Sequence, residues 1–510
     1  MTGGVGGRPA ENARRSRVPA VALVLVCVAG VAHAETRPRY GGTVEATLLG
    51  APVTFDPTTV QTHADITVAD LVFDTLYRVG PSGLATPHLA AALPVLDKTK
   101  VTIAIRKGVR FHDGSALTAS DVVASLDRVR ATSARWALAP IASLSAPNAE
   151  TVELVLRAPV PELPLLLALP LTAVTKGGKA PTAEKVIGTG PFAIEAFDRG
   201  RKRLRLKAFD DHFAGRPYLD SLVLGWYDSP DGEARRFETG ATQVSARGTG
   251  AFAGAQPKFR AEDVEGPAAL LVYVGFGKAH ADVTGERAFR RALDLALARE
   301  ALKTVTSGER VVPTREPVPV EAGGATPSQA ARNGDLAAAQ AALAEAAKRV
   351  KSLAPDRLGQ LKLDIFVEDT RPDDREIAER VVRALDKLGI ASAVIAEPAH
   401  VFRDRVAKGN ADLWIGQLAV PVSNAWLWWA AAFAAGGDSW AMQQLAHGSV
   451  DSTAAQKQFA ARLPIVPLMF RAVKFWHRTD VRGLVFDASG RPCFAEVHLF
   501  GEPTKSRGKP

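Results

Sequence analysis

The chain has 510 residues, of which 47% are hydrophobic and 23% charged, and its formal net charge is +9. This is the composition of a folded globular protein with room for two or three domains, and it excludes a disordered chain. No apolar run reaches the ~18 residues of a membrane-spanning helix, and the scattered basic residues exclude the dense positive surface of a nucleic-acid-binding protein.

Residues 1–34 have the pattern of a secretory signal peptide. Arginines at positions 14, 15 and 17 precede an apolar run at residues 18–31, and Ala32-His33-Ala34 forms a small-residue cleavage site. We therefore expect the mature chain to begin near Glu35 and to reside in the periplasm.

Cys27 offers an alternative, because a lipid attached there would anchor the chain to the membrane. Val24-Leu25-Val26 lacks the small side chains that a lipoprotein signal needs before its cysteine, which favours cleavage without lipidation. The pair Arg14-Arg15 leaves general secretion and twin-arginine export both open. Cleavage would leave Cys493 as the single cysteine, so we expect no internal disulfide.

The first predicted elements are two strands and a helix. Residues 43–48 alternate as a strand, residues 65–76 have the period of an amphipathic helix, and residues 96–106 alternate again. Residues 110–129 then predict a strand, a turn and a helix in close succession.

The helix of this corner has a defined start. Asp113-Gly114 is a turn dipeptide, and Thr118 can act as the N-cap with Asp121 three residues later. An apolar stripe at helical spacing follows, made of Val122, Leu126 and Val129. Every one of these features fixes geometry and none supplies chemistry, so the segment is architectural.

Glycines and a linker interrupt the middle of the chain. Gly188-Thr189-Gly190-Pro191 predicts a tight bend into a strand, and the absence of a following Gly-Lys-Ser/Thr argues against phosphate binding. Residues 261–267 have the composition of a linker, and residues 270–276 that of a buried strand.

The second part of the chain contains a β-α-β pattern. A strand at 361–367, a helix at 374–388 and a strand at 392–396 predict a parallel strand pair. Another strand follows at 412–416, and short strands are expected near the end of the chain, at 465–470, 475–476 and 484–486.

The sequence offers little for catalysis or metal binding. Its ten histidines lack zinc-binding spacing, and no H-E-x-x-H motif occurs. The nearest approach to a nucleophile elbow is Gly437-Asp438-Ser439-Trp440-Ala441, where alanine stands in place of the second glycine. We therefore expect no catalytic residue, no metal site and no cofactor.

Short motifs occur in a fixed order along the chain. They are Gly41-Gly42-Thr43, Phe55-Asp56-Pro57, Phe111-His112-Asp113-Gly114, Leu117-Thr118-Ala119-Ser120-Asp121-Val122, Gly188-Thr189-Gly190-Pro191-Phe192, Phe213-Ala214-Gly215-Arg216-Pro217-Tyr218 and Phe289-Arg290-Arg291-Ala292-Leu293. Together they resemble the extracellular solute-binding proteins of family 5, the peptide/nickel class serving ABC importers. The C-terminal half matches more loosely.

The resemblance implies a periplasmic-binding-protein-like α/β fold, with two α/β lobes joined by a hinge and a ligand cleft between them. Lobe I would comprise residues 35–262 and a return segment at 465–502, lobe II residues 268–462, and a flexible tail residues 503–510. The implied partners are a small-molecule or peptide ligand and an ABC permease of the inner membrane, and a monomer is expected.

The resemblance also suggests ligand-binding residues in lobe II. Peptide-binding relatives have a Gly-Trp-x-Ala-Asp run whose aspartate pairs with the peptide ammonium. The matching run here is Gly416-Gln417-Leu418-Ala419-Val420, in which valine replaces the aspartate. Because losing one partner of such a pair costs ~2–5 kcal/mol, a ligand without a free amine fits better.

Other ligand contacts are expected from lobe I and from tryptophans. Gln61, Thr62 and His63 follow the Asp-Pro turn, where the relatives contact their ligands, although a plain surface loop is the alternative. Trp414 and Trp426 could stack on a ligand, and Trp426 could instead belong to the core.

Two other functions stay open at this point. One is a solute-binding protein that acts as a sensor or scaffold without transport. The other is a secreted serine hydrolase that uses Ser439. The sequence identifies neither the ligand nor the partner permease.

Overall fold

The structure, a computed structural model, describes most of the chain from Pro38 to Phe500. The described residues are 38, 40–60, 62–79, 84–182, 185–227, 229–246, 257–258, 260–305, 310–324, 333–369, 371–420, 422, 424–448, 451–487 and 490–500. The predicted signal peptide 1–34 with Cys27, the tail 503–510 and the candidate ligand residue Gln61 lie outside them.

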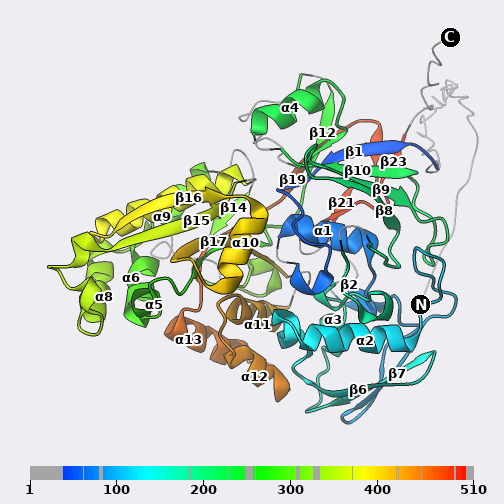
Figure 1. Cartoon of the computed structure of the whole chain (residues 1–510), viewed down its shortest axis with the longest axis horizontal. Coiled ribbons are helices and arrows are strands. Elements are labelled where there is room, and N and C mark those ends of the chain that lie inside the picture. Colours follow the sequence, from blue (N-terminus) through cyan, green and yellow to red (C-terminus); the bar gives the residue numbers. More distant parts are fainter. Residues whose placement is uncertain are drawn as a thin grey trace, which may run out of the picture. The chain divides into compact units, whose positions relative to one another are not determined.

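A seven-stranded sheet, called the first sheet below, contains the early part of the chain and a late strand (Figure 1). Its strands in spatial order are β12 (Ala261–Glu265), β19 (Lys474–Arg478), β11 (Val244–Ser245), β1 (Thr43–Thr47), β10 (Ser221–Gly225), β9 (Arg203–Ala208) and β8 (Phe192–Asp198). The described pairs are parallel where β1 meets β10 and β11, and antiparallel elsewhere. The predicted strand at 43–48 is confirmed, whereas the predicted linker at 261–267 is wrong over Ala261–Glu265, which forms edge strand β12.

A six-stranded sheet, called the second sheet, contains most of the later chain. In spatial order it consists of β14 (Val311–Pro313), β18 (Val466–Arg471), β13 (Leu270–Phe276), β17 (Leu413–Ala419), β15 (Lys362–Glu368) and β16 (Ala391–Glu397). The predicted strand at 270–276 is confirmed residue for residue. The predicted β-α-β unit is also confirmed, because β15 and β16 pair in parallel and α9 (Pro372–Lys387) connects them.

The chain passes between the two sheets twice, along neighbouring strands. It leaves the first sheet after β12 and enters the second at β13, and it returns from β18 to β19 between Arg471 and Lys474. Strands β12 and β19 pair with each other in the first sheet, and β13 and β18 pair in the second. The chain therefore returns to the first sheet only after β18. The predicted return segment begins earlier, at residue 465.

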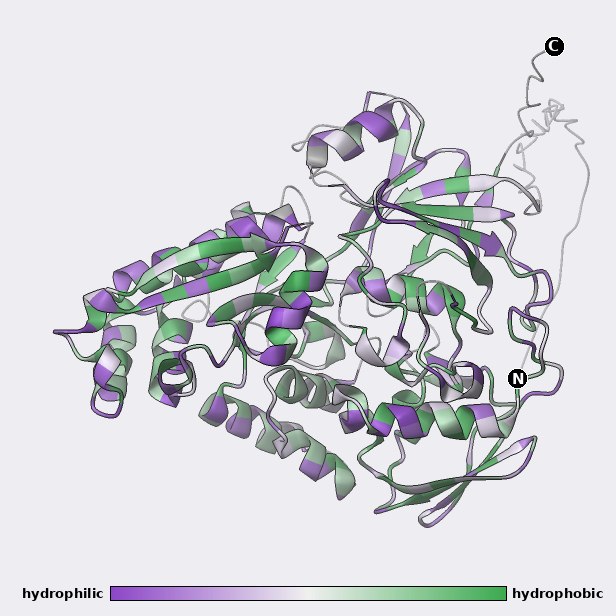
Figure 2. Ribbon diagram, in the orientation of Figure 1, coloured by the Kyte–Doolittle hydropathy of each residue, from purple (hydrophilic) through white to green (hydrophobic). Residues whose placement is uncertain are grey.

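A smaller four-stranded sheet packs against α2 (Ala119–Arg130), as Figure 1 shows for β6 and β7. Its strands in order are β4 (Val95–Asp97), β5 (Lys100–Ala104), β7 (Thr151–Leu156) and β6 (Ile141–Asn148). Apolar and polar residues alternate around α2 (Figure 2), and Val122, Leu126 and Val129 are fully buried, as the stripe predicted. Thr118 is the N-cap, and the Asp121 carboxylate accepts from its N–H at 2.9 Å and from its hydroxyl at 2.6 Å.

The other helices cover the sheets. They are α1 (His63–Val72), α3 (Leu163–Leu166), α4 (Pro230–Glu238), α5 (Ala281–Thr284), α6 (Arg287–Ala296), α8 (Leu336–Ala347), α10 (Ala399–Lys408), α11 (Ala425–Ala435), α12 (Trp440–Ala446) and α13 (Ser452–Arg462). Among the described residues, no helix combines the length and the apolar character needed to cross a bilayer. The predicted helix at 65–76 is confirmed as α1, which begins two residues earlier, at a capping box of Thr62 and Asp65, and ends at Val72.

Side chains from several segments, one of them the Gly-Thr-Gly motif, meet at the buried carboxylate of Asp74, just after α1. His88 Nε2 lies 2.7 Å from Asp74 Oδ1, the Arg78 guanidinium donates to Oδ1 at 3.0 Å, and the Thr189 hydroxyl donates to Oδ2 at 3.0 Å. His212 Nε2 lies 3.6 Å from Oδ2. Burial alone would raise the pKa of Asp74, but its histidine and arginine neighbours outweigh burial and hold that pKa well below the ordinary value.

The Gly-Thr-Gly bend is required by its close approach to the end of α1. A Cβ at Gly188 would lie 1.9 Å from the Val72 carbonyl oxygen, and a Cβ at Gly190 would lie 2.5 Å from the Val72 carbonyl carbon. His112 of the Phe-His-Asp-Gly motif fastens the same bend, because its Nε2 donates to the Gly190 carbonyl at 2.9 Å. The motifs thus build a corner of the first part of the fold, as the sequence indicated.

Candidate functional site

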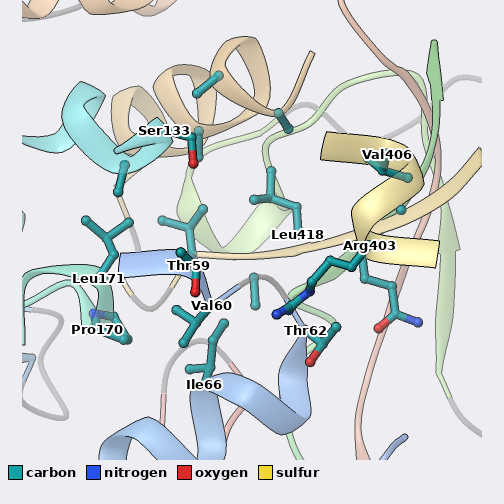
Figure 3. A pocket seen from close by; sticks show the side chains of 18 of the residues that line it. Thr59, Val60, Thr62, Ile66, Ser133, Pro170, Leu171, Arg403, Val406 and Leu418 are labelled. Atoms are coloured by element: carbon teal, nitrogen blue, oxygen red, sulfur yellow. The ribbon is translucent and has the colours of Figure 1, made fainter. Parts of the chain in front are cut away.

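A cavity of about 220 Å³ is lined by residues from elements on both sheets. The lining residues from the first part of the chain belong to 3-10 turn η1 (Pro57–Thr59), the start of α1, and turns η2 (Ser133–Leu138) and η3 (Pro170–Thr172). Those from the second sheet and its helices belong to β13, β15, β17, α10 and α11 and to the residues next to them. Figure 3 shows Thr59, Val60, Pro170 and Leu171 facing Leu418 and Arg403 across this space.

Two aromatic side chains of the second sheet lie flat on strand glycines at the cavity. Tyr273 on β13 is directly opposite Gly416 on β17, and Trp414 is opposite Gly275. A Cβ at Gly416 would lie 2.3 Å from Tyr273 Cζ, and one at Gly275 would lie 2.1 Å from Trp414 Cε2. Only glycine leaves room for these rings. Burial raises the pKa of Tyr273 to about 12, with a hydrogen bond from Trp414 opposing it, so the phenol is neutral at pH 7.

Hydroxyl groups line the opposite side, on the turn that follows the Asp-Pro motif. Asp56 caps η1 by accepting from the Thr58 N–H and hydroxyl, each at 2.9 Å. Arg128 of α2 donates to both Asp56 carboxylate oxygens, at 2.8 and 2.7 Å. These contacts hold Thr58 and Thr59 at the cavity, where Thr62 and Ser133 also lie.

An ion pair joins the two sides of the cavity. Arg403 of α10 donates to Asp65 Oδ2 at the start of α1, and Figure 3 shows Arg403 reaching toward Thr62. Asp65 Oδ1 also accepts from the N–H groups of Val53 and Thr54, at 2.8 and 3.2 Å. The aspartate is fully buried, so Arg403 provides its countercharge across the cavity.

A second charged group lies at the carboxyl end of β15. Arg371 donates to Glu368 Oε2 at 2.8 Å and lies 3.1 Å from Asp374 Oδ2. Burial opposes the charged form of Arg371, but Glu368 and Asp374 outweigh it and raise the pKa of the guanidinium. Burial also raises the pKa of Asp374, although the positive charge of Arg371 opposes this effect. The side-chain amide of Gln417 donates to Asp374 Oδ1 at 3.2 Å.

Most of the described candidate ligand residues are brought together here. Those that line the cavity are Thr62, Trp414, Gly416, Gln417, Leu418, Ala419 and Val420. His63 and Trp426 are outside the lining. His63 is buried beside the Gly490 carbonyl, 3.2 Å from its Nε2, and Trp426 belongs to the apolar core around α11, the alternative that its helical spacing had suggested.

Sequence reasoning missed three parts of the lining. These are turns η2 and η3, the pair Glu368 and Arg371, and the α10 residues Phe402, Arg403 and Val406. One signal could have found Glu368 and Arg371, because ligands in α/β folds bind at the carboxyl ends of parallel strands. The α10 residues lie on a helix whose sequence shows no such mark.

Ser439 lies away from the cavity lining, at the start of α12. Its exposed hydroxyl accepts from the Gln443 side-chain amide at 3.3 Å. This contact is that of an ordinary helix start and gives no support to a hydrolase. Within the described residues, no group of three or more His, Cys, Asp or Glu side chains is arranged to hold a metal ion.

Comparison with known proteins places the chain in a family. The model of the bacterial extracellular solute-binding proteins, family 5 (middle region), matches residues 85–438, which run from the four-stranded sheet to the end of α11. The chain belongs to this family. The resemblance seen in the sequence motifs is therefore confirmed.

Relatives of this family 5 chain match it over part of their length. Protein XP55 of Streptomyces lividans is 29% identical over 265 residues, or 49% of this chain and 48% of that protein. The HTH-type transcriptional regulator SgrR of Escherichia coli O1:K1 is 29% identical over 32% of this chain and 28% of its own length. The chain thus spans about half or less of the length of these curated relatives.

The fold is that of a solved family structure. The oligopeptide-binding protein AppA of Bacillus subtilis, in complex with a nonapeptide, superposes with a TM-score of 0.74 at 18% identity. The match covers 91% of this chain and 100% of AppA. The periplasmic-binding-protein-like α/β fold predicted from the sequence is confirmed.

Proposed function

We propose that this family 5 protein is the periplasmic substrate-binding component of an ABC importer, which holds a small solute in the cavity and delivers it to a membrane permease. The observation that carries the proposal is the cavity itself, which is lined by α1 and turns of the first part of the chain on one side and by the second sheet and its helices on the other, with the pair of Arg403 and Asp65 joining the two sides. A ligand that contacts both sides of the cavity favours the conformation in which the two sides are close together. Ligand binding is thereby coupled to a conformational change that a partner can recognise.

The cavity is suited to a compact ligand. Its volume of about 220 Å³ is below the ~300–1,000 Å³ of pockets for drug-sized molecules. At the position matching the relatives' aspartate, the buried Val420 lines the wall. A peptide ammonium would lose its ion-pair partner there, so we propose a small solute rather than an ordinary free-amine peptide.

A ligand screen by thermal shift tests the binding function. The purified protein is exposed to peptides, sugars and metal complexes, and a true ligand at a hundredfold excess over Kd stabilises it by ~2.7 kcal/mol. Solution scattering with and without the hit then measures closure. No stabilisation by any class of solute would overturn the proposal.

A cavity-filling variant ties binding to this site. Ala434→Phe places a ring in the cavity and is expected to abolish the stabilisation by the hit. Ala337→Phe, on the exposed face of α8, is the matched control and should leave it unchanged. Equal binding by both variants would show that the ligand sits elsewhere.

A second candidate is a solute sensor that does not feed a transporter. The similarity to a segment of SgrR, whose name describes a transcriptional regulator, favours it. Uptake of the labelled ligand in cells with and without the gene separates the two functions. Loss of uptake supports the importer, and unchanged uptake supports the sensor.

The cell location is part of the same proposal. If residues 1–34 act as the expected signal peptide, protein from the periplasmic fraction begins at Glu35 by N-terminal sequencing. If the chain is instead a lipoprotein, its N-terminal residue is a lipid-modified Cys27 and the protein is found with the membrane fraction.

A further inference from the structure

The charged side chains that line the cavity are already paired within the protein. They are Glu368, Arg371 and Arg403. Arg403 pairs with Asp65 across the cavity, and Arg371 pairs with Glu368 at 2.8 Å and with Asp374 at 3.1 Å. A ligand charge would therefore have to compete with an existing partner.

Two of the acids in these pairs, Asp65 and Asp374, lie behind the cavity lining, and Glu368 at the lining is almost fully buried. Asp65 and Asp374 are 0% exposed and Glu368 is 2% exposed. An ammonium would have to displace a guanidinium in order to contact one of them, and this would leave a buried arginine without its countercharge. A cationic ligand could therefore reach only Glu368, and only in competition with Arg371.

Nor is there a surplus of positive charge for an anion. Two guanidiniums, those of Arg371 and Arg403, face the three carboxylates of Asp65, Glu368 and Asp374. A ligand carboxylate near Arg403 would gain an arginine contact but would also meet the negative charge of Asp65. Removing either an ammonium or a carboxylate of the ligand from water costs free energy, and the contacts in the cavity do not fully offset this cost.

The rest of the lining is neutral. Tyr273 and Trp414 provide flat aromatic surface, Thr59, Thr62 and Ser133 provide hydroxyl groups, and Gln417 provides an amide. Such a wall binds an apolar or ring-shaped body and makes hydrogen bonds with groups that carry no formal charge.

We propose that the cavity selects uncharged ligands, namely compact molecules with a flat or apolar body and hydroxyl or amide groups. The proposal rests on the binding function proposed above and names its substrate class. The ion pairs of Arg403 with Asp65 and of Arg371 with Glu368 and Asp374 are what disfavour ligands with ammonium or carboxylate groups.

Matched sets of compounds test this on the unmodified protein. In one set the neutral N-acetylphenylalanine amide is compared with phenylalanine amide, N-acetylphenylalanine and phenylalanine. In another, methyl glucoside is compared with glucosamine and glucuronate. We expect the tightest-binding member of any set that binds to be the neutral one, by tenfold or more in Kd from calorimetry.

A charged member that binds as tightly as its neutral counterpart would overturn the proposal while leaving the binding function intact. If no member of either set binds but the broad ligand screen finds a charged solute, the substrate class is wrong and the binding function stands. If the screen also finds nothing, both proposals fail.

A variant that unbalances the charges gives a second, independent measurement. Glu368→Gln removes the carboxylate beside Arg371 and is expected to improve binding of the anionic member relative to the neutral one by tenfold or more. Glu376→Gln, an exposed glutamate on α9, is the matched control and should leave the ratio unchanged. An unchanged ratio in a folded Glu368→Gln protein would count against charge selection; should this variant fail to fold, the matched sets on the unmodified protein decide.

Discussion

Helix α1 has a buried aspartate at each end, and the two have opposite roles. Asp74, just beyond the last turn, is bound by Arg78, His88 and Thr189, all from the first part of the chain. Asp65, in the first turn, is bound by Arg403, which belongs to a helix on the second sheet. The same type of side chain holds one corner of the fold together at one end and joins two sides of the cavity at the other.

The residues around Asp74 identify the family, whereas the residues around Asp65 lie where a ligand would bind. The Gly-Thr-Gly bend, which is a family motif, and His212, which directly precedes another one, gather around Asp74. Arg403, Arg371 and Glu368, at the cavity, belong to none of those motifs. Motifs that reveal the fold therefore say little about the solute, because they serve packing.

Replacing Asp74 should give the largest effect on stability. Asp74→Asn removes the charge shared by Arg78 and His88 and presents an amide donor to the Thr189 hydroxyl, which should cost ~3–5 kcal/mol of unfolding free energy. Urea denaturation measures it, with the exposed Asp97→Asn as control. A loss below ~1 kcal/mol would mean that the Asp74 cluster is not the anchor of this corner.

Removing the cavity ion pair should act on binding instead. Arg403→Ala leaves Asp65 with backbone donors but without its countercharge, and we expect a loss of about 2 kcal/mol in ligand affinity, roughly thirtyfold in Kd. Arg405→Ala on the same helix breaks a pair with Glu397 that stays on the second sheet, so it should leave Kd unchanged. Equal changes in Kd for the two variants would mean that the pair at the start of α1 has no special role in ligand binding.

The pH dependence of stability sharpens the placement of His63, which is buried in the first turn of α1 but lies outside the cavity lining. Burial, the largest effect, lowers the pKa of His63 to about 4, with the Gly490 carbonyl opposing it. Since an unfolded histidine titrates near ~6.5, only the unfolded state gains this proton as the pH falls below that value, and stability declines. Between pH 7 and pH 5 the loss from this residue is about 2 kcal/mol.

Urea denaturation at the two pH values measures this loss, and His63→Gln should remove it. The same variant should bind ligand as the unmodified protein does, because His63 is not part of the cavity lining. A large change in Kd for His63→Gln would return His63 to the ligand site.

The smallest expected effect comes from the strand glycine beneath Tyr273. Gly416→Ala pushes the ring off its position and should weaken binding about tenfold, or ~1.4 kcal/mol. Gly359→Ala, where a Cβ would have nothing within 4 Å, is the matched control and should be neutral. Unchanged affinity in Gly416→Ala would mean that the ligand does not rest on this ring.

The sequence predicts local elements well where one face is apolar. The strand at 270–276 and the start of α2 at Thr118 both lie where the periodicity and capping signals placed them. The β12 strand was missed because Ala-Glu-Asp-Val-Glu has no apolar face, as expected for an edge strand that pairs along one side only.

The site was predicted in part, for a related reason. The run Gly416–Val420 was found through the family resemblance, and the structure places all of it on the cavity wall. Arg403 could not be found in this way, because its partner Asp65 is distant in the sequence and is brought to it by tertiary structure. Arg371 pairs with its sequence neighbours Glu368 and Asp374, and only its position at the carboxyl end of β15 marks it as a cavity residue. The ligand role of His63 stays a prediction: its neighbour Thr62 lines the cavity, whereas its own ring lies beside the Gly490 carbonyl, outside the lining.

The two connections between the sheets run side by side, β12 to β13 in one direction and β18 to β19 in the other. A single proteolytic cut in either connection, for example near Pro267, would leave the second one as a covalent tether. The nicked polypeptide would migrate as two fragments under denaturing conditions and still stay associated in its native state, because β19 on the second fragment pairs with β11 and β12 on the first.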